Sequence, residues 1–263
     1  MAAAVVTGAG IAFSAVTLGE TSAGADQGTR PSTTSPAPPP APPPVLPFNA
    51  KIFSNAIPAP DGGVRSGGCS GSLIAPEWII TAGHCFHGLD DVRISGKPDH
   101  VISVTVGKRK DSDPGGHTAE VVDVRQSPVN DIALARLSTA VPDAVPLALA
   151  DGPPAVGQQL SFVGWGSRSP DVKLPSDQLK RGQFAVLEVK EAMVEADSVV
   201  PRTVDNSPCP VDSGAPYFIS TDDRTGTLVA VESSGPPCPQ HGRELLSRVD
   251  VVVDWIHQQL ASP

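Results

Sequence analysis

The stretch CSGSLIAPEWIITAGHC, residues 69–85, carries the clearest strand pattern in this chain of 263 residues. An apolar run ends at Ala75 and Pro76, and the residues from Trp78 to Thr81 form a second run of strand length. His84 follows closely, and Cys85 stands next to it, where a disulfide would hold the histidine in place. The stretch therefore predicts two short strands that end beside an anchored histidine.

The rest of the chain repeats this pattern of short apolar runs separated by turn-forming residues. Alternation of apolar and polar residues, typical of half-buried antiparallel strands, is visible in ISVTV (102–106) and AVLEV (185–189). The turn-rich segment TDDRTG (221–226) joins the last two runs. Beyond residue 81 the predicted strands are 100–107, 119–127, 131–137, 159–166, 183–190, 215–220 and 227–235. Such spacing predicts an all-β barrel or sandwich.

One helix is predicted near the C-terminal end, at residues 249–260. Val249, Val252 and Ile256 recur there at helical spacing, and Leu260 continues the same face. We expect this apolar face to pack against the barrel.

The composition bounds the domain count and excludes some functions. A hydrophobic content of 40% allows one large domain or two small ones, and 29 prolines with 25 glycines favour turns and short strands. The net charge is −9, and the basic run GKRK (107–110) is too short to form a nucleic-acid footprint. We therefore expect a soluble partner or substrate and no nucleic acid.

The first 25 residues are typical of an export signal. An apolar run of small residues leads to Ala23, Gly24 and Ala25, which fit an A-x-A cleavage site, although no basic residue precedes Arg30. A membrane anchor is the alternative, but the run is short and diluted with Gly, Thr and Ser. We expect a secreted protein with no stable membrane insertion once residues 1–25 are removed.

A proline-rich segment, residues 26–51, is predicted to be a linker or pro-segment. Nine of the 17 residues in 31–47 are proline, which favours an extended polyproline II spacer. A docking site for a proline-recognising module is the alternative. The folded domain is predicted to cover residues 52–263.

Four cysteines, an even number in a chain with an export signal, predict two disulfides. Three pairings are possible, and local closure, with Cys69 joined to Cys85 and Cys209 to Cys238, is the simplest. HCFH (84–87) raises the alternative of a metal site, but no C-x-x-C pair accompanies it. We expect neither a metal nor a cofactor.

Three stretches hold the residue types that nucleophilic hydrolysis needs: a hydroxyl, a base to take its proton and an acid to orient that base. TAGHC (81–85) supplies His84 at a strand end, and NDIALARL (130–137) begins a strand with Asp131. DSGAP (212–216) places Ser213 among small residues that let a ligand backbone approach. His84, Asp131 and Ser213 are thus the candidate catalytic residues.

Together, these motifs resemble those of the trypsin-like (chymotrypsin-fold, S1) serine proteases. CSGSLIAPEWIITAGHC resembles the histidine signature, NDIALARL the aspartate motif, FVGWG (162–166) the Gly-Trp-Gly segment and CPVDSGAP (209–216) the nucleophile motif. VESSGPPC (231–238) is similar to the substrate strand and its cysteine, and the order His, Asp, Ser is that of the family. The likeness covers residues 52–260 and has the style of secreted bacterial, actinobacterial members.

The resemblance implies a fold and an activity. The fold would be all-β, with two six-stranded antiparallel barrels and a C-terminal α-helix. The activity would be that of a serine endopeptidase acting on peptide or protein substrates, expected to be a monomer. Ser213 would be the nucleophile, His84 the base and then the acid, and Asp131 the group that orients His84. The family's disulfides would also be Cys69–Cys85 and Cys209–Cys238.

The substrate-binding residues follow from the same resemblance. Ser233 matches the serine that supports the aspartate from behind, and Gly235 would offer backbone hydrogen bonds to an extended peptide. Ser207 stands where members that prefer Lys or Arg carry an aspartate, which does not support a simple trypsin preference. Glu244 falls near the pocket base, where it either attracts a basic side chain or is a solvated loop residue. Ser234 replaces a tryptophan, which would open the cleft.

Val211 departs from the family at the oxyanion hole, which its N–H would form together with that of Ser213. Glycine at this position readily takes a positive φ, whereas a β-branched residue there is strained. The sequence therefore predicts that the loop follows another path or that the hole is incompletely formed, giving a slow enzyme. The alternative is a catalytically impaired relative that acts as a peptide- or surface-binding module.

Activation is the last expectation from the resemblance. In animal members a newly cleaved N-terminal amine pairs with the aspartate before the nucleophile, here Asp212. Cleavage between Lys51 and Ile52 would supply such an amine, although IFSN (52–55) departs from the family's Ile-Val-Gly-Gly. Only 17 positions separate Ile52 from Cys69, fewer than in trypsin, so we expect the first strand to be lost or rearranged.

Overall fold

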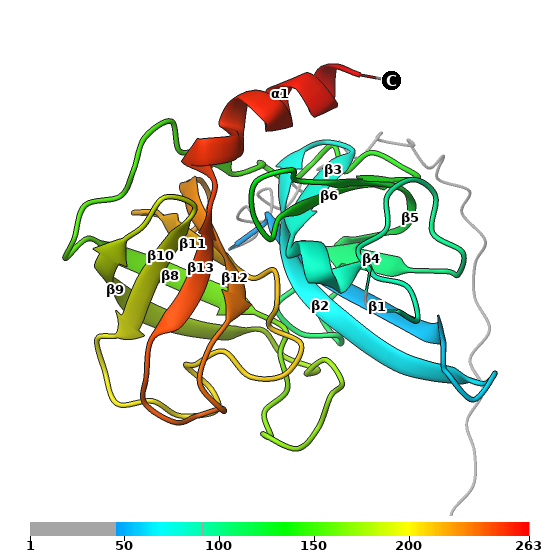
Figure 1. Ribbon diagram of the computed structural model, residues 1–263, viewed down its shortest axis with the longest axis horizontal. Coiled ribbons are helices and arrows are strands. Elements are labelled where there is room, and N and C mark those ends of the chain that lie inside the picture. Colours follow the sequence, from blue (N-terminus) through cyan, green and yellow to red (C-terminus); the bar gives the residue numbers. More distant parts are fainter. Residues whose placement is uncertain (1–45, 91, 263) are drawn as a thin grey trace, which may run out of the picture. The chain divides into compact units, whose positions relative to one another are not determined.

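The computed structural model describes residues 46–90 and 92–262, which all belong to one compact unit. Short strands dominate this part of the chain, as the turn-rich sequence predicts (Figure 1). The strands are β1 (Asn49–Pro58), β2 (Val64–Ala75), β3 (Trp78–Thr81), β4 (Ser103–Val106), β5 (His117–Gln126), β6 (Ala133–Leu137), β7 (Ala148–Leu149), β8 (Gln159–Gly164), β9 (Lys180–Val189), β10 (Met193–Ser198), β11 (Pro216–Ile219), β12 (Thr227–Ser234) and β13 (Glu244–Arg248). The helices are the 3₁₀ turns η1 (Gly83–Cys85) and η2 (Asp250–Val252) and the α-helix α1 (Val253–Ala261).

The first barrel is closed by six antiparallel strands in the order β1-β2-β3-β6-β5-β4. Alternate residues of its strands point inward, so that Val104 and Val106 of β4 are buried whereas Ser103 and Thr105 are half-exposed. Burial of one face of each strand is what the alternation in the sequence predicts. Strands β3 and β6 are buried along almost their whole length, and Arg136 of β6 is the half-buried exception.

The second barrel contains six antiparallel strands in the order β11-β8-β9-β10-β13-β12, and pairing between β11 and β12 closes it. The short strand β7 adds a parallel edge to β12. Three buried aromatic rings fill the interior, with ring centroids between 5.2 and 5.8 Å apart: Phe162, Phe184 and Tyr217. The predicted fold of two six-stranded antiparallel barrels is confirmed.

The folded part begins earlier than the predicted boundary at residue 52. Strand β1 starts at Asn49, and Phe48 is completely buried against Phe218, with ring centroids 5.0 Å apart. The prediction of a lost first strand was therefore wrong, because residues 46–51, assigned to the linker, carry core side chains. The predicted signal at 1–25 and the proline-rich part up to residue 45 lie outside the described residues.

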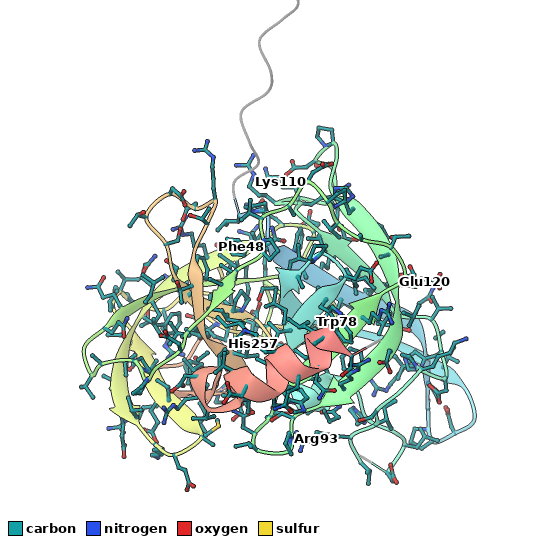
Figure 2. All side chains as sticks on the ribbon, turned by 90° about the horizontal axis from the view of Figure 1, so that it is seen from above. Phe48, Trp78, Arg93, Lys110, Glu120 and His257 are labelled. Atoms are coloured by element: carbon teal, nitrogen blue, oxygen red, sulfur yellow. A yellow bond between two sulfur atoms is a disulfide. The ribbon has the colours of Figure 1, made fainter. Side chains whose placement is uncertain are left out.

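Helix α1 follows η2 directly, so the predicted helix at 249–260 has a 3₁₀ first turn. Its apolar face is buried through Ile256, and Arg125 lies over the Trp78 ring at 4.7 Å while it donates a hydrogen bond to the Gln259 carbonyl. Figure 2 looks onto this helix, with His257 on it and Trp78 in the first barrel. No helix in the described part of the chain has the length and apolarity needed to cross a membrane.

Candidate active site

Three loop segments bring His84, Asp131 and Ser213 together. His84 lies in η1 directly after β3, Asp131 precedes β6, and Ser213 precedes β11 of the second barrel. The His84 Nε2 atom is 2.8 Å from the Ser213 Oγ atom, and its Nδ1 atom is 2.7 Å from Asp131 Oδ2. An imidazole protonated at Nδ1 donates to the carboxylate and leaves Nε2 free to accept the Ser213 hydroxyl proton.

Asp131 is held by more than the imidazole. The His84 backbone N–H donates to its Oδ1 atom at 2.8 Å, and the Ser233 hydroxyl donates to Oδ2 at 2.7 Å. Burial opposes ionisation, but the hydrogen bonds and charge of His84 with the bond from Ser233 outweigh it, so the pKa of Asp131 lies below its usual value. The carboxylate is therefore charged at neutral pH and fixes the ring orientation.

The two disulfides join the expected pairs, Cys69 with Cys85 and Cys209 with Cys238. The first connects β2 to η1, the turn that carries His84. The second connects the loop before Ser213 to the segment after β12. Each cross-link therefore holds one of the segments that surround the candidate nucleophile.

Val211 adopts a left-handed backbone conformation, with φ at +80°. The N–H groups of Val211 and Ser213 donate to no acceptor within the described residues, 46–90 and 92–262. Backbone donors without a protein partner beside a nucleophile are what an oxyanion site requires. The expectation of another loop path was wrong, since the valine takes the conformation that glycine would take.

Ser70 on β2 ties this loop down. Its N–H donates to the Ser213 carbonyl at 2.9 Å, and its hydroxyl donates to the Val211 carbonyl at 3.2 Å. The backbone N–H of Trp165 in turn donates to the Ser70 hydroxyl at 2.8 Å. One buried side chain of the first barrel thus fixes the nucleophile loop of the second.

Asp212 and Ile52 are not brought together. Asp212 is fully buried and forms an ion pair with Lys180 at 2.5 Å. Ile52 lies inside β1, where it pairs with Cys69 of β2 and Val104 of β4. The expected activation pair is absent from this arrangement of the described residues, because another cation fills the place and Ile52 is part of a continuous strand.

A pocket of about 260 Å³ lies on one side of Ser213 and is the candidate primary specificity pocket. Its walls contain the C-terminal end of β12 and the residues after it, including Ser233 and Gly235. Ser207 does not line it: this residue is fully buried, and its hydroxyl donates to Asn206 Oδ1 at 3.1 Å. A role for Ser207 in substrate binding therefore stays a prediction.

Glu244 lines the same pocket and is not a solvated loop residue. It forms an ion pair with Arg202, which also pairs with Asp197 at 2.7 Å. A side chain at position 235 would collide with Glu244, since a Cβ built on Gly235 falls 1.5 Å from its Oε2 atom. Glycine at 235 therefore makes room for a carboxylate at the pocket wall.

A second acid, Glu232 of β12, lies beside Glu244. Its pKa is raised well above the usual value by burial and by the neighbouring charge of Glu244, and the Tyr217 hydroxyl donates to it at 2.8 Å. Burial raises the pKa of Glu244 to about 7, against the opposing effect of Arg202. The two neighbouring acids thus both have raised pKa values, and Glu244 changes its charge near neutral pH.

A cavity of about 190 Å³ lies on the other side of Ser213. Its lining is mainly apolar, with Phe86, Ile94 and Ile102 beyond the Cys69–Cys85 disulfide. Ser213 thus lines both the pocket that contains Glu244 and this second cavity. Within the described residues no cluster of His, Cys, Asp and Glu has the arrangement that a metal ion needs.

Several residues at the site were missed by sequence reasoning. Ser70 lies one position after a half-cystine, Lys180 begins a strand, and Glu232 ends a continuous apolar run. The run LVAV before Glu232 could have indicated its burial, because residues 228–232 of β12 are all buried. No local signal distinguishes Lys180 or Arg202 from ordinary surface cations, since their partners lie 32 and 42 positions away.

A comparison with protein families matches residues 53–256 to the family described as Trypsin. The chain belongs to this family. It is 30% identical over 234 residues to the chymotrypsin-like elastase family member 3B of Macaca mulatta, covering 74% of this chain and 82% of that protein. Human trypsin-3 is 29% identical over 210 residues, with 74% of this chain and 65% of that protein covered.

The fold likeness extends to solved structures. The chain superposes on neuropsin, a serine protease expressed in the limbic system of mouse brain, with a TM-score of 0.63 and 21% identity. The match covers 82% of this chain and 95% of the neuropsin chain. This trypsin-family protein is a serine endopeptidase, a hydrolase, as predicted. The relatives named here are animal proteins, so the bacterial type stays a prediction.

Proposed function

We propose that the protein cleaves peptide bonds through an acyl-enzyme on Ser213, with His84 as base and Asp131 as its orienting acid. The single observation that carries this proposal is the unbroken relay of two short hydrogen bonds, 2.8 Å from Ser213 Oγ to His84 Nε2 and 2.7 Å from Nδ1 to Asp131. Three further groups hold these side chains in place. The Ser233 hydroxyl and the His84 amide donate hydrogen bonds to Asp131, and the Cys69–Cys85 disulfide anchors the turn that carries His84.

The chemistry follows from the direction of the protons. Ser213 attacks the scissile carbonyl carbon while its proton passes to His84 Nε2, and Asp131 stabilises the imidazolium that forms. His84 then gives this proton to the leaving amine, and a water molecule repeats the sequence on the acyl-enzyme. The lowered pKa of Asp131 keeps the carboxylate charged through both steps.

The developing oxyanion would be bound by the free N–H groups of Val211 and Ser213. Oriented donors in a partly dry site stabilise such a charge and typically contribute about 10²- to 10³-fold each to the rate. The substrate backbone would add a strand along Ser233–Gly235 at the end of β12, with its first side chain in the pocket beside Glu244. Protein or peptide substrates are expected, without a cofactor.

The remaining assignments rest on the sequence. We propose residues 1–25 as an export signal, the proline-rich segment up to residue 45 as a linker or pro-segment, and a secreted, monomeric protease domain from Leu46 onward. Two disulfides support an oxidising compartment. The style of the motifs supports a secreted bacterial protease.

Hydrolysis of a peptide library tests the function. With an activated ester of a cleaved peptide we expect an initial burst of leaving group equal to the concentration of folded enzyme, followed by turnover, because acylation by such an ester is faster than attack of water on the acyl-enzyme. Ser213→Ala and His84→Ala should each abolish the burst, whereas Ser72→Ala, a buried serine on β2 outside the relay, should retain it. Folded protein that binds peptides without cleaving any of them would instead support the impaired peptide-binding relative.

A further inference from the structure

We infer that Lys180 is a built-in substitute for the cleaved N-terminal amine, so that the nucleophile loop is organised in the uncleaved chain. This inference rests on the proposed function and concerns its regulation: the protease needs no new N-terminus at Ile52. Asp212 stands next to Ser213 and one residue after Val211, so whatever holds its carboxylate also holds both proposed oxyanion donors.

The Asp212 carboxylate occupies a closed, fully satisfied site. The Gly166 N–H donates to Oδ1 at 2.7 Å, and the Cys209 N–H donates to Oδ2 at 2.9 Å. A Cβ on Gly164 or Gly166 would lie 2.0 Å or 1.9 Å from the carboxylate oxygens, so the two glycines of the GWG segment create the space. The carboxylate is completely shielded from solvent.

The Lys180 ammonium completes this site. It lies 2.5 Å from Asp212 Oδ2 and donates to the carbonyls of Ser207 at 2.9 Å and Ser167 at 3.2 Å. Three acceptors match the three N–H bonds of an ammonium. Its side chain is 1% exposed and that of Asp212 is fully buried, so the position that a new N-terminal ammonium would take beside the carboxylate is already filled.

The pairing is required electrostatically as well as sterically. Burial raises the pKa of Asp212, and the charge and hydrogen bond of Lys180 oppose this rise. Without Lys180 the carboxylate would be an uncompensated buried charge, which either takes up a proton or moves toward water. Either change would disturb the 209–214 loop that carries Ser213.

Ile52 is an internal residue of a barrel strand and not a chain end. It is the fourth residue of β1 and pairs with both neighbouring strands. The residues before it are part of the fold: Phe48 is fully buried, and the Trp165 indole donates to Asn49 Oδ1 at 2.8 Å. Cleavage at Lys51–Ile52 would detach these contacts from the barrel, so it should inactivate the enzyme rather than activate it.

The first test compares chains of known N-terminus. Purified protein that starts before Leu46, verified by intact mass, should show full titration of Ser213 with a fluorophosphonate and full peptide hydrolysis. Protease treatment that cuts between Lys51 and Ile52 should lower both signals. An intact chain that is inactive until such a cut would overturn the inference while leaving the proposed function standing, whereas folded chains inactive before and after it would overturn the proposed function.

The second test replaces the cation. Lys180→Met should lower kcat and the Ser213 labelling rate by at least about 10²-fold, the usual effect of losing an oxyanion donor, with a smaller change in KM. Lys180→Arg keeps a charge and should recover most of the labelling rate. Lys190→Met, one residue beyond the C-terminal end of β9, where the lysine pairs with Glu195, should leave both rates unchanged.

Unchanged rates in folded Lys180→Met protein would overturn the inference. If this variant does not fold, the N-terminus experiment still decides, because it uses the unmodified chain. Equal losses in Lys180→Met and Lys180→Arg, at matched thermal stability, would also count against a role for the charge.

Discussion

The Ser70 hydroxyl donates a hydrogen bond to the Val211 carbonyl at 3.2 Å, and Val211 holds a φ of +80°. A left-handed conformation costs a residue other than glycine roughly 1–2 kcal/mol, and it persists only where neighbouring contacts hold it. Ser70 is the side chain that makes this contact. The strained residue, Val211, therefore lies in a loop of the second barrel, whereas Ser70, the clamp that holds its carbonyl, lies in the first.

Removing the clamp should slow catalysis. In Ser70→Ala the Val211 carbonyl loses its hydrogen-bond donor, and the buried backbone N–H of Trp165 loses its acceptor. The strained peptide group of Val211 is then free to rotate. We expect kcat to fall by about 10- to 100-fold with little change in KM, since misplacing one catalytic group by about 1 Å has effects of this size. Steady-state kinetics on one peptide substrate measures both constants.

Ser72→Ala is the matched control for the clamp. Ser72 is a fully buried serine on the same strand, and within the described residues its hydroxyl has no hydrogen-bond partner. Its replacement should leave kcat unchanged. Equal effects of the two substitutions would show that Ser70 acts through packing and not through Val211.

Relieving the strain should change stability more than rate. Val211→Gly removes roughly 1–2 kcal/mol of backbone strain, and the greater flexibility of glycine in the unfolded chain offsets about 0.5–1 kcal/mol of it. We therefore expect a gain near 1 kcal/mol in the free energy of unfolding, measured by urea denaturation, because the donor is already oriented. A rise in kcat of about 10²-fold, the value of a whole oxyanion donor, would instead mean that the hole is incomplete in the native enzyme.

The sequence predicts the fold and the residues that come together beside Ser213 because both depend on local patterns. Strand β3 was predicted at its observed limits, and His84 and Ser213 stand in short motifs whose neighbours, Cys85 and Asp212, serve the same loops. Each motif lies within a few residues of the side chain that it indicates, so a single sequence is enough to recognise it.

Contacts between distant residues could not be predicted in the same way. Lys180 resembles a surface lysine in the sequence LKRGQ, and only the tertiary structure shows that it neutralises Asp212. Phe48 follows a proline-rich run, which hid its burial in the core. Val211 shows the converse. A β-branched side chain disfavours the observed positive φ, and the hydrogen bond from Ser70 overrides that local preference.

The pocket charge should make substrate preference depend on pH. Burial raises the pKa of Glu244 to about 7, so its carboxyl becomes negative as the pH rises from 6 to 8. A substrate with lysine in the pocket should then gain in kcat/KM over one with leucine by roughly tenfold, the equivalent of one pKa unit. Ratios of the two kcat/KM values across this range measure the effect.

Glu244→Gln should abolish this pH dependence of the ratio, because the amide stays neutral. Glu188→Gln, at an exposed glutamate of β9, is the control and should retain the wild-type dependence. A ratio in Glu244→Gln that still rises with pH would assign the titration to another group.

The buried acid Glu232 should reduce stability as the pH rises. Its pKa is raised in the folded chain by burial, so its stabilising contribution is present below the unfolded value of 4.5 and is lost as the pH rises toward the folded pKa. In that window the free energy of unfolding should fall by up to about 1.4 kcal/mol per pH unit through this one proton.

Glu232→Gln removes the titrating group and keeps an acceptor for the Tyr217 hydroxyl. Urea unfolding at pH 5 and pH 8 should show a smaller loss of stability in this variant than in the wild-type enzyme. The same loss in both proteins would mean that Glu232 ionises normally in the folded state.

Covalent labelling of the folded, intact chain tests the central claim most directly. After reaction with a fluorophosphonate, intact mass and peptide mapping should show one adduct per chain, on Ser213, and His84→Ala should slow its formation by several orders of magnitude. A folded chain that takes up no adduct, or one whose Ser213 reacts equally fast without His84, would contradict the proposed Ser213–His84–Asp131 mechanism.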